Sequence, residues 1–165
     1  MDVPALYRTH HAPLVRYLTR LCGDPDLADD AAQEAFVRLA ERPPAEEREL
    51  RAWLFTVATN VVRDARRTGR RRAEILAGDP EGASPTPPGP DPADDVVRTE
   101  LRRRVRAALD ALPERDRAVL LMREEGFKHR EIADAVGITT GSVGTVIARA
   151  LDRLAARLPR DLEDA

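Results

Sequence analysis

Apolar side chains recur at three- and four-residue spacing along most of this chain, which is the pattern of one face of an α-helix. The first run extends from Val3 to Leu21, and we expect Pro13 to break or kink it. The second run opens with Asp24 as the helix cap and Pro25 as the first helical residue, and should end near Glu41. Both segments therefore predict amphipathic helices.

The third run, from Leu50 to about Arg72, shows the strongest helical periodicity. Its predicted buried stripe consists of Leu50, Trp53, Leu54, Val57, Ala58, Val61, Val62 and Ala65. Its far end is rich in arginine. We expect three helices to form one small N-terminal domain, residues 1–77.

Residues 78–95 contain six prolines, three glycines and five acidic side chains, a composition that favours a disordered, Pro-rich, flexible linker. Beyond it we predict helices from Val96 to Leu112, from Pro113 onward, from His129 to Val136 and from Thr139 to Leu158. These form a second, four-helix domain, residues 96–165, with no further extension expected. The predicted fold class is all-α, with two small helical domains.

Composition agrees with helices and bounds the chemistry. Of the 165 residues 34% are charged and only 4% aromatic, and the formal net charge is −2. Five of the 29 acidic residues and none of the 27 basic ones lie in the linker, so the remainder is slightly basic. Any contact with nucleic acid must then come from local arginine patches.

Several function classes are excluded by what the sequence lacks. His10 and His11 are adjacent and point to different sides of a helix, and Cys22 is the single cysteine, so we expect no metal site, cofactor or catalytic group. There is no long apolar run and no signal peptide. We expect a cytoplasmic protein that is not an enzyme.

Residues 129–146 match a helix-turn-helix, whose second helix enters the major groove of DNA. Thr139 is the expected cap of that second helix. The positions that close the core of such a motif are occupied in the expected order by Ile132, Ala133, Val136, Gly137, Ile138, Val143 and Val146. This motif predicts DNA binding.

Two further surfaces are candidates for function. The polar face of the Trp53 helix could contact nucleic acid through its arginines and an aromatic ring, although Trp53 could equally belong to the core. The second helix combines acidic side chains with Phe36, which we expect to be exposed, and suits docking onto a protein. Solvation of an ordinary surface would explain both sets as well.

Three stretches together resemble one family. They read DDAAQEAFVRL, then LRAWLFTVATNVVRDARR, then ALPERDRAVLLMREEGFKHREIADAVGITTGSVGTVIARAL. Their order, with a variable linker between the second and third, is similar to that of the extracytoplasmic-function (group IV) sigma factors of the sigma-70 family. The resemblance implies transcription initiation with core RNA polymerase (its β′ and β subunits), promoter DNA and an anti-sigma factor as partners, and a free monomer.

The resemblance also implies roles for particular residues. Polymerase binding is implied for Asp29, Asp30, Gln33, Glu34 and Phe36. Recognition and melting of the −10 element is implied for Trp53, Thr56, Asn60, Arg63, Asp64, Arg66 and Arg67, and base capture for the preceding loop, residues 42–49. Reading of the −35 element is implied for Lys128, Arg130, Thr139, Thr140, Ser142, Thr145 and Arg149.

The chain departs from the family pattern at several points. Gly144 and Val146 stand where the family's recognition helix usually has Lys and Arg, and the loop at residues 42–49 is acidic. Lys128-His129 stands where the family usually has a capping Ser/Thr-aromatic pair. This helix-turn-helix should therefore hold DNA weakly by itself.

Two other functions remain open from the sequence alone. A stand-alone regulator would need two recognition helices about 34 Å apart, hence a dimer, and no long dimerisation helix is present. A sigma-like decoy that occupies polymerase without reading DNA would fit the weak recognition helix. The basic end of the Trp53 helix argues against a decoy.

Overall fold

The computed structural model describes residues 1–76 and 96–158, and all regular structure in these ranges is helical. The chain divides into two compact units, Met1–Thr86 and Pro87–Ala165. The segment predicted to be a linker, residues 78–95, lies outside the described residues. The prediction of an all-α protein with two small helical domains is confirmed.

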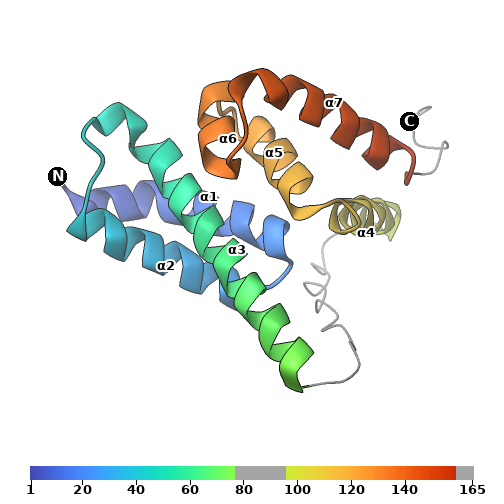
Figure 1. The fold of residues 1–165 in the computed structure, drawn as a ribbon, viewed down its shortest axis with the longest axis horizontal. Helices are drawn as coiled ribbons and strands as arrows, with labels where there is room; N and C mark the ends of the chain where they lie inside the picture. Colours follow the sequence, from blue (N-terminus) through green and yellow to red (C-terminus); the bar gives the residue numbers. More distant parts are fainter. Residues whose placement is uncertain (77–95, 159–165) are drawn as a thin grey trace. The chain divides into compact units, whose positions relative to one another are not determined.

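The N-terminal unit begins with two antiparallel helices, α1 (Val3–Cys22) and α2 (Pro25–Glu41), which lie side by side (Figure 1). The expected break at Pro13 does not occur, since α1 continues through this residue to Cys22. Gly23 ends α1 in the left-handed conformation, with φ at 72°.

Asp24 caps α2 as predicted: its carboxylate accepts hydrogen bonds from the backbone N–H groups of Asp26 and Leu27, at 3.0 and 3.2 Å. Four alanines on the inner face of α2 are fully buried, at positions 28, 31, 32 and 35. Such small side chains allow neighbouring helices to approach closely. This close packing fixes α2 against α1 and α3 and leaves its outer face toward solvent.

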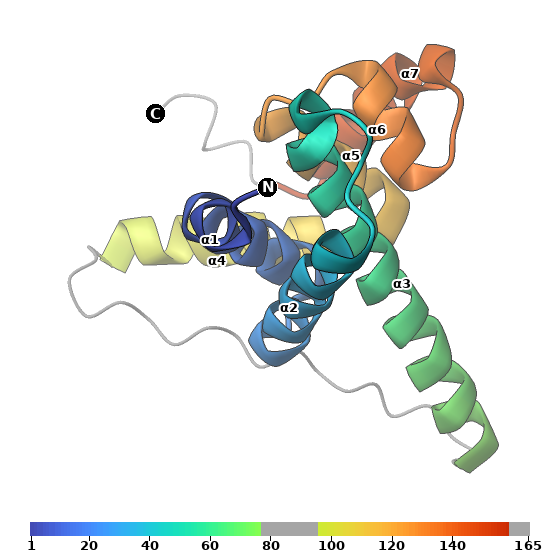
Figure 2. The ribbon, with the colours of Figure 1, turned by 90° about the vertical axis from the view of Figure 1, so that its left-hand side faces the viewer.

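A short 3₁₀ turn, η1 (Glu47–Glu49), leads into α3 (Leu50–Leu76), which crosses α1 and α2. The helix continues four residues beyond the predicted end near Arg72. Figure 2 shows that the last part of α3 extends past the other two helices, and every residue from 67 to 76 is exposed. The basic end of α3 is therefore open to solvent.

The predicted buried stripe of α3 is partly wrong. Phe55 and Thr59 are buried, whereas Trp53 is half-buried and Ala65 is exposed. Thr59 is held in the core because its hydroxyl bonds Tyr17 of α1. Hydrophobic periodicity does not predict a buried polar residue. The stripe predicted from it therefore lay closer to Trp53 than the face of α3 that is buried in the structure.

The C-terminal unit contains α4 (Val96–Asp110), α5 (Glu114–Glu124), α6 (His129–Val136) and α7 (Thr140–Ala155). Helices α5, α6 and α7 pack against one another. The first and last are each shorter than predicted, because α4 ends at Asp110 rather than Leu112 and α7 spans neither Thr139 nor Leu158. The seven residues predicted to form the core of the helix-turn-helix are buried, apart from half-buried Ile138 and the exposed turn residue Gly137.

Among the described residues of this unit, two charged side chains are buried. The carboxylate of Asp116 is fully buried and accepts hydrogen bonds from Arg115 at 3.2 Å and from Arg153 of α7 at 2.8 Å. Arg117 donates to the backbone carbonyl groups of Leu109, Asp110 and Leu112, at 2.8 to 3.0 Å. These bonds fix α7 on α5 and close the end of α4.

Candidate functional site

The outer face of α2 presents the acidic surface that the sequence predicted. Asp30 and Gln33 are exposed, and Asp29 and Glu34 are half-exposed. Gln33 donates a hydrogen bond to Asp29 at 2.7 Å, and Arg38 pairs with Glu34 at 2.8 Å. Asp29 and Glu34 are thus held in place on the outer side of the helix.

Phe36 is not the exposed aromatic residue that was expected, since only 5% of it is accessible. Its ring lies 5.0 Å from that of Tyr7, which is 41% exposed and stacks on His11 at 4.3 Å. His11 Nε2 lies 3.4 Å from an Asp29 carboxylate oxygen. The exposed aromatic ring beside the acidic surface therefore comes from α1, and its only sequence signal was the four-residue spacing of Tyr7 and His11.

The polar residues predicted on α3 form a continuous ridge. Positions 53, 56, 60, 63 and 67 follow one another at three- and four-residue spacing, so their side chains share one face. Trp53, Thr56, Asn60 and Arg63 are half-buried, whereas Asp64 and Arg67 are exposed. Trp53 is only half-buried, so part of this residue is accessible at the start of the ridge.

Two contacts modify the basic end of α3. Arg66 donates a hydrogen bond to the backbone carbonyl of Cys22 at 2.7 Å and so braces α3 on the end of α1. Arg67 lies 3.6 Å from Asp64, and both side chains are mostly exposed. An exposed pair of this kind contributes little and leaves Arg67 able to exchange its partner for a phosphate.

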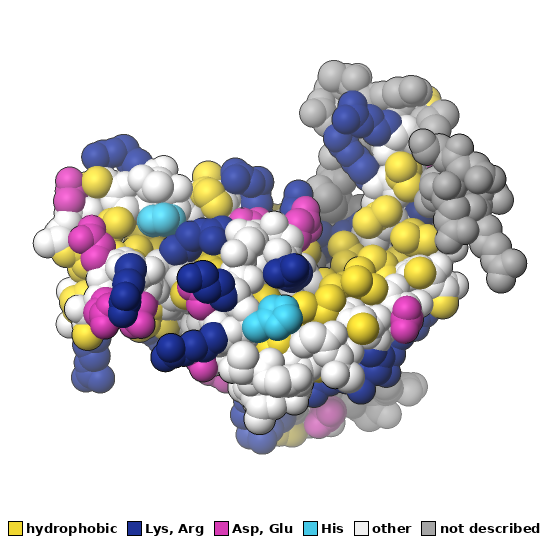
Figure 3. Space-filling model, turned by 90° about the horizontal axis from the view of Figure 1, so that it is seen from above, with side chains coloured by type: hydrophobic (Ala, Val, Ile, Leu, Met, Phe, Trp, Pro, Cys, Tyr) yellow, Lys and Arg dark blue, Asp and Glu magenta, His cyan; other side chains and the backbone are white. Residues whose placement is uncertain are grey.

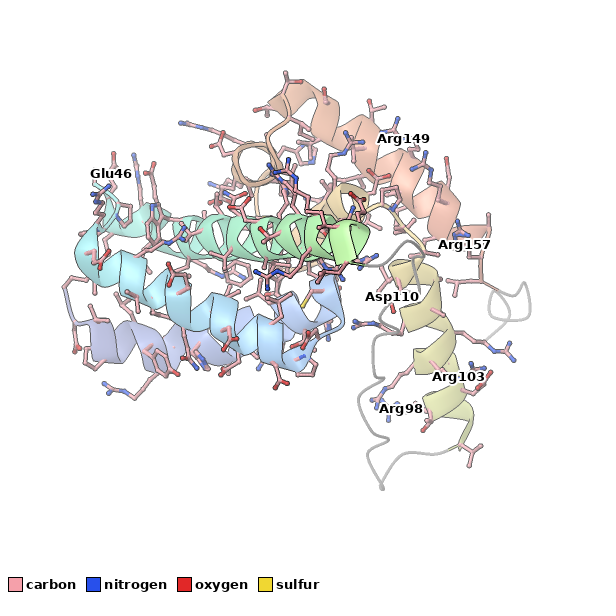
Figure 4. The ribbon with its side chains drawn as sticks, turned by 60° about the horizontal axis from the view of Figure 1, so that its bottom comes forward. Glu46, Arg98, Arg103, Asp110, Arg149 and Arg157 are labelled. Atoms are coloured by element: carbon pink, nitrogen blue, oxygen red, sulfur yellow. The ribbon has the colours of Figure 1, made fainter. Side chains whose placement is uncertain are left out.

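The loop before α3 is acidic on its surface, as the sequence indicated. Glu46, Glu47 and Glu49 are exposed, and Arg48 pairs with Glu46. Figure 4 places Glu46 in this loop, pointing outward. A negatively charged loop repels a phosphate backbone, so any nucleotide that it receives must enter base first.

The helix-turn-helix is formed by α6 and α7. Gly137 ends α6 with φ at 73°, and its N–H bonds the Ala133 carbonyl at 2.9 Å. The seven predicted contact residues are all exposed: Lys128, Arg130, Thr139, Thr140, Ser142, Thr145 and Arg149. In Figure 4 the Arg149 side chain points away from α7. The structure thus brings the predicted set to the surface of one motif.

The caps of these two helices differ from the expectation. Thr139 occupies the capping position of α7, but its hydroxyl contacts the Ser142 hydroxyl at 2.6 Å instead of a backbone N–H. At the start of α6 the Glu131 carboxylate accepts a hydrogen bond from the backbone N–H of Lys128 at 2.7 Å. Glu131 therefore makes the bond of the third helical residue in a capping box, in which the N-cap backbone N–H is the donor.

Basic side chains do not form one continuous patch on the face shown in Figure 3. On the face shown in Figure 3, Lys and Arg side chains are interspersed with acidic and uncharged ones. On α4, Glu100 bonds Arg103 and Arg104 at 2.7 to 2.9 Å, and these bonds lower the pKa of the Glu100 carboxyl to about 2. The arginines of α4 are in part neutralised by their own helix.

Among the described residues, no three His, Cys, Asp or Glu side chains are grouped so as to hold a metal ion. Within the same ranges, none of the helices combines the length and apolarity required for a membrane span.

Comparison with known proteins places both units in one family pattern. The family described as Sigma-70 region 2 matches residues 6–72, and Sigma-70, region 4 matches residues 102–154. The ECF RNA polymerase sigma factor SigL of Mycobacterium tuberculosis is 39% identical over 144 residues, which cover 84% of this chain and 78% of SigL. The ferric citrate uptake sigma factor FecI of Escherichia coli is 33% identical, over 90% of this chain and 86% of FecI.

Solved structures show the same fold. The sigma factor RpoE of Bartonella quintana, in complex with the anti-sigma factor NepR, superposes with a TM-score of 0.77 at 23% identity, covering 97% of this chain and 98% of RpoE. CnrH, in complex with the cytosolic domain of CnrY, gives a TM-score of 0.63 at 25% identity, covering 93% of this chain and 85% of CnrH.

Proposed function

This chain belongs to the extracytoplasmic-function group of the sigma-70 family, and from that premise we propose which of its surfaces carries each step of transcription initiation. As a sigma factor it binds core RNA polymerase and directs promoter-specific initiation, and it is not an enzyme. The steps to be assigned are docking on polymerase, opening of the promoter and recognition of the upstream element.

The acidic face of α2 docks on the coiled coil of the polymerase β′ subunit. Exposed Asp30 and Gln33 provide charge and hydrogen bonding, and Tyr7 of α1 provides the exposed aromatic ring. Phe36 acts from beneath by supporting Tyr7. This assignment is supported by the hydrogen bond between Gln33 and Asp29 and the ion pair of Arg38 with Glu34, because prealigned side chains lose little entropy on binding.

The ridge of α3 contacts the promoter at the −10 element. Trp53 can stack on an unpaired base at one end of the ridge, and Arg63 and Arg67 can bind backbone phosphates further along. The observation that carries this proposal is the continuity of the ridge: one helix face runs from half-buried Trp53 through half-buried Arg63 to exposed Arg67, on a helix whose last part extends past α1 and α2. Such a face suits a single strand held by both its bases and its backbone.

The helix-turn-helix reads the −35 element through the first residues of α7. Thr140, Ser142 and Thr145 are exposed there, and Arg149 lies one turn further along. These side chains make fewer charged contacts than an arginine-rich recognition helix would. Stable reading of the upstream element therefore requires polymerase to hold this unit on the DNA.

The test is in vitro transcription by holoenzyme reconstituted from purified core polymerase and the full chain. Wild type should initiate specifically on promoters selected from a random-sequence library. Arg63→Ala combined with Arg67→Ala should reduce open-complex formation about tenfold or more, as loss of two phosphate contacts requires. The control, Arg16→Ala with Arg157→Ala, removes the same charge from exposed positions elsewhere and should retain activity.

A stand-alone regulator would bind duplex DNA tightly as a dimer without polymerase. A decoy would bind polymerase but give no initiation. Either result contradicts the assignment. The two solved relatives are bound to an anti-sigma factor and to the cytosolic domain of CnrY, respectively. By analogy an anti-sigma factor regulates this chain, which is monomeric when free and acts in the cytoplasm.

A further inference from the structure

A histidine of the first helix of the motif lies over the recognition helix at Gly144. A Cβ atom added to Gly144 would meet a single neighbour within 4 Å, the Cε1 atom of His129, at 3.9 Å. Gly144 is exposed, and so is His129, the first residue of α6. The imidazole ring therefore stands at the surface, next to the position where α7 has no side chain.

The neighbouring residues of α7 give this position its significance. From Thr140 to Ala148 the helix contains only Gly, Ala, Ser, Thr and apolar residues, so no long polar side chain projects from its first half. Because position 144 is glycine, α7 has no side chain there that could reach a phosphate. His129 supplies a polar ring at that place from the other helix.

The surroundings of His129 indicate an anionic ligand. Lys128 and Arg130 flank it and are both exposed. The N-terminus of α6 carries the partial positive charge of the helix dipole, and the Glu131 carboxylate accepts a hydrogen bond from the N–H of Lys128 at this end. In a helix-turn-helix the first helix crosses the DNA backbone beside the groove that the second helix occupies. A phosphate of that strand can meet the His129 ring, and Lys128 and Arg130 add positive charge on either side of it.

We propose that His129 is a DNA-contacting residue of this motif, donating an imidazole N–H to a backbone phosphate of the upstream promoter element in place of the side chain that Gly144 lacks. The proposal rests on the function assigned above to α6 and α7. Imidazole has an N–H to donate in either protonation state. The phosphate contact fixes the position of α7 in the groove, and the hydroxyl groups of α7 read the bases.

The experiment is a double-mutant cycle in which one change is made in the protein and the other in the DNA, and binding is measured for each combination. Holoenzyme containing wild type or His129→Ala is bound to a promoter selected from a random library, with a single neutral methylphosphonate placed in turn at each upstream phosphate. His129→Ala should weaken binding to unmodified DNA about tenfold, the loss of one hydrogen bond to a charged group. At one phosphate, the loss caused by methylphosphonate in wild type should disappear in His129→Ala.

Three further variants sharpen the test. Gly144→Ala should bind as wild type, because its methyl group meets His129 at an ordinary contact distance. Gly144→Lys should restore binding to His129→Ala by reaching the same phosphate from α7. Arg157→Ala removes a charge just beyond the C-terminal end of α7, away from Arg149 in Figure 4, and should have little effect.

Two results would overturn the proposal. One is equal binding by His129→Ala and wild type. The other is a methylphosphonate profile that is unchanged by the substitution. If wild type itself binds independently of the upstream DNA, the assignment of the −35 element to this motif fails as well. Specific initiation that depends on the upstream element supports that assignment whatever the result for His129.

Discussion

Tyr17 of α1 donates a buried hydrogen bond to Thr59 of α3, with 2.9 Å between the two hydroxyl oxygens. The direction of the bond follows from a second one, because the Thr59 hydroxyl already donates its proton to the Phe55 carbonyl at 2.6 Å. Only 1% of Tyr17 and 2% of Thr59 is accessible to solvent. The bond joins the first helix to α3, the helix for which we propose promoter contacts.

Removing the acceptor of this bond should destabilise the N-terminal unit. Thr59→Val leaves the buried Tyr17 hydroxyl without its Thr59 partner and should lower the free energy of unfolding by about 1–3 kcal/mol. Tyr17→Phe should cost less, because Thr59 keeps its bond to Phe55. Urea unfolding followed by fluorescence reports on this unit, since Trp53 is the single tryptophan.

Thr56→Val is the matched control, because the Thr56 hydroxyl bonds the carbonyl of Ala52 on its own helix, at 2.8 Å. It should change the urea midpoint much less. Equal losses for Thr56→Val and Thr59→Val would show that the bond between helices contributes nothing.

The buried carboxylate of Asp116 should determine how firmly α7 is held on α5. Asp116→Asn removes the charge that binds Arg153, and Arg153 is partly exposed, so we expect a loss of about 1–3 kcal/mol in the stability of the C-terminal unit. Thermal unfolding followed by circular dichroism measures it. Asp134→Asn, at an exposed position of α6, should leave the transition of this unit unchanged, and a similar loss there would contradict the prediction.

Two glycines should respond to alanine in opposite directions. Gly69 lies inside α3 with open space where an added methyl group would lie, so Gly69→Ala should stabilise the exposed end of that helix by about 0.5–1 kcal/mol. Gly137 has φ at 73°, so Gly137→Ala should destabilise the C-terminal unit by about 1–2 kcal/mol. Amide hydrogen exchange of residues 67–76 and thermal unfolding distinguish the two effects. Faster exchange in Gly69→Ala would refute the first.

The stability of the N-terminal unit should fall in mildly acidic solution through His10. Burial and the nearby positive charge of Arg51 lower the pKa of His10 below the ordinary value of about 6.5. The unfolded chain therefore takes up the proton first as the pH falls. Stability is complete above about pH 6.5 and decreases below it.

His10→Gln should flatten this dependence between about pH 7.5 and 5.5, as measured by the melting temperature from Trp53 fluorescence. His129→Gln, in the other unit, serves as the control and should leave the slope unaltered. A slope in His10→Gln as steep as in wild type would assign the effect to other groups.

The local signals of the sequence predicted much of the fold. Asp24 and Pro25 indicated the start of α2 because capping depends on residues within one helical turn. Gly137 indicated the turn of the helix-turn-helix because only a residue without a side chain adopts its backbone angles at no cost. The polar surfaces of α2, α3 and the helix-turn-helix were predicted from the three- and four-residue spacing of their side chains, which is also a local signal.

Sequence by itself therefore determined the helical class, the two units, the family and which residues of α3 and α7 share a face. Only the tertiary structure decided that Phe36 is covered by Tyr7, that Thr59 rather than Trp53 is buried, and that the His129 ring lies beside Gly144. The physical reason is that each of these depends on a partner from another helix. Periodicity shows that a helix has an apolar face, but the width of that face is set by the helices packed against it.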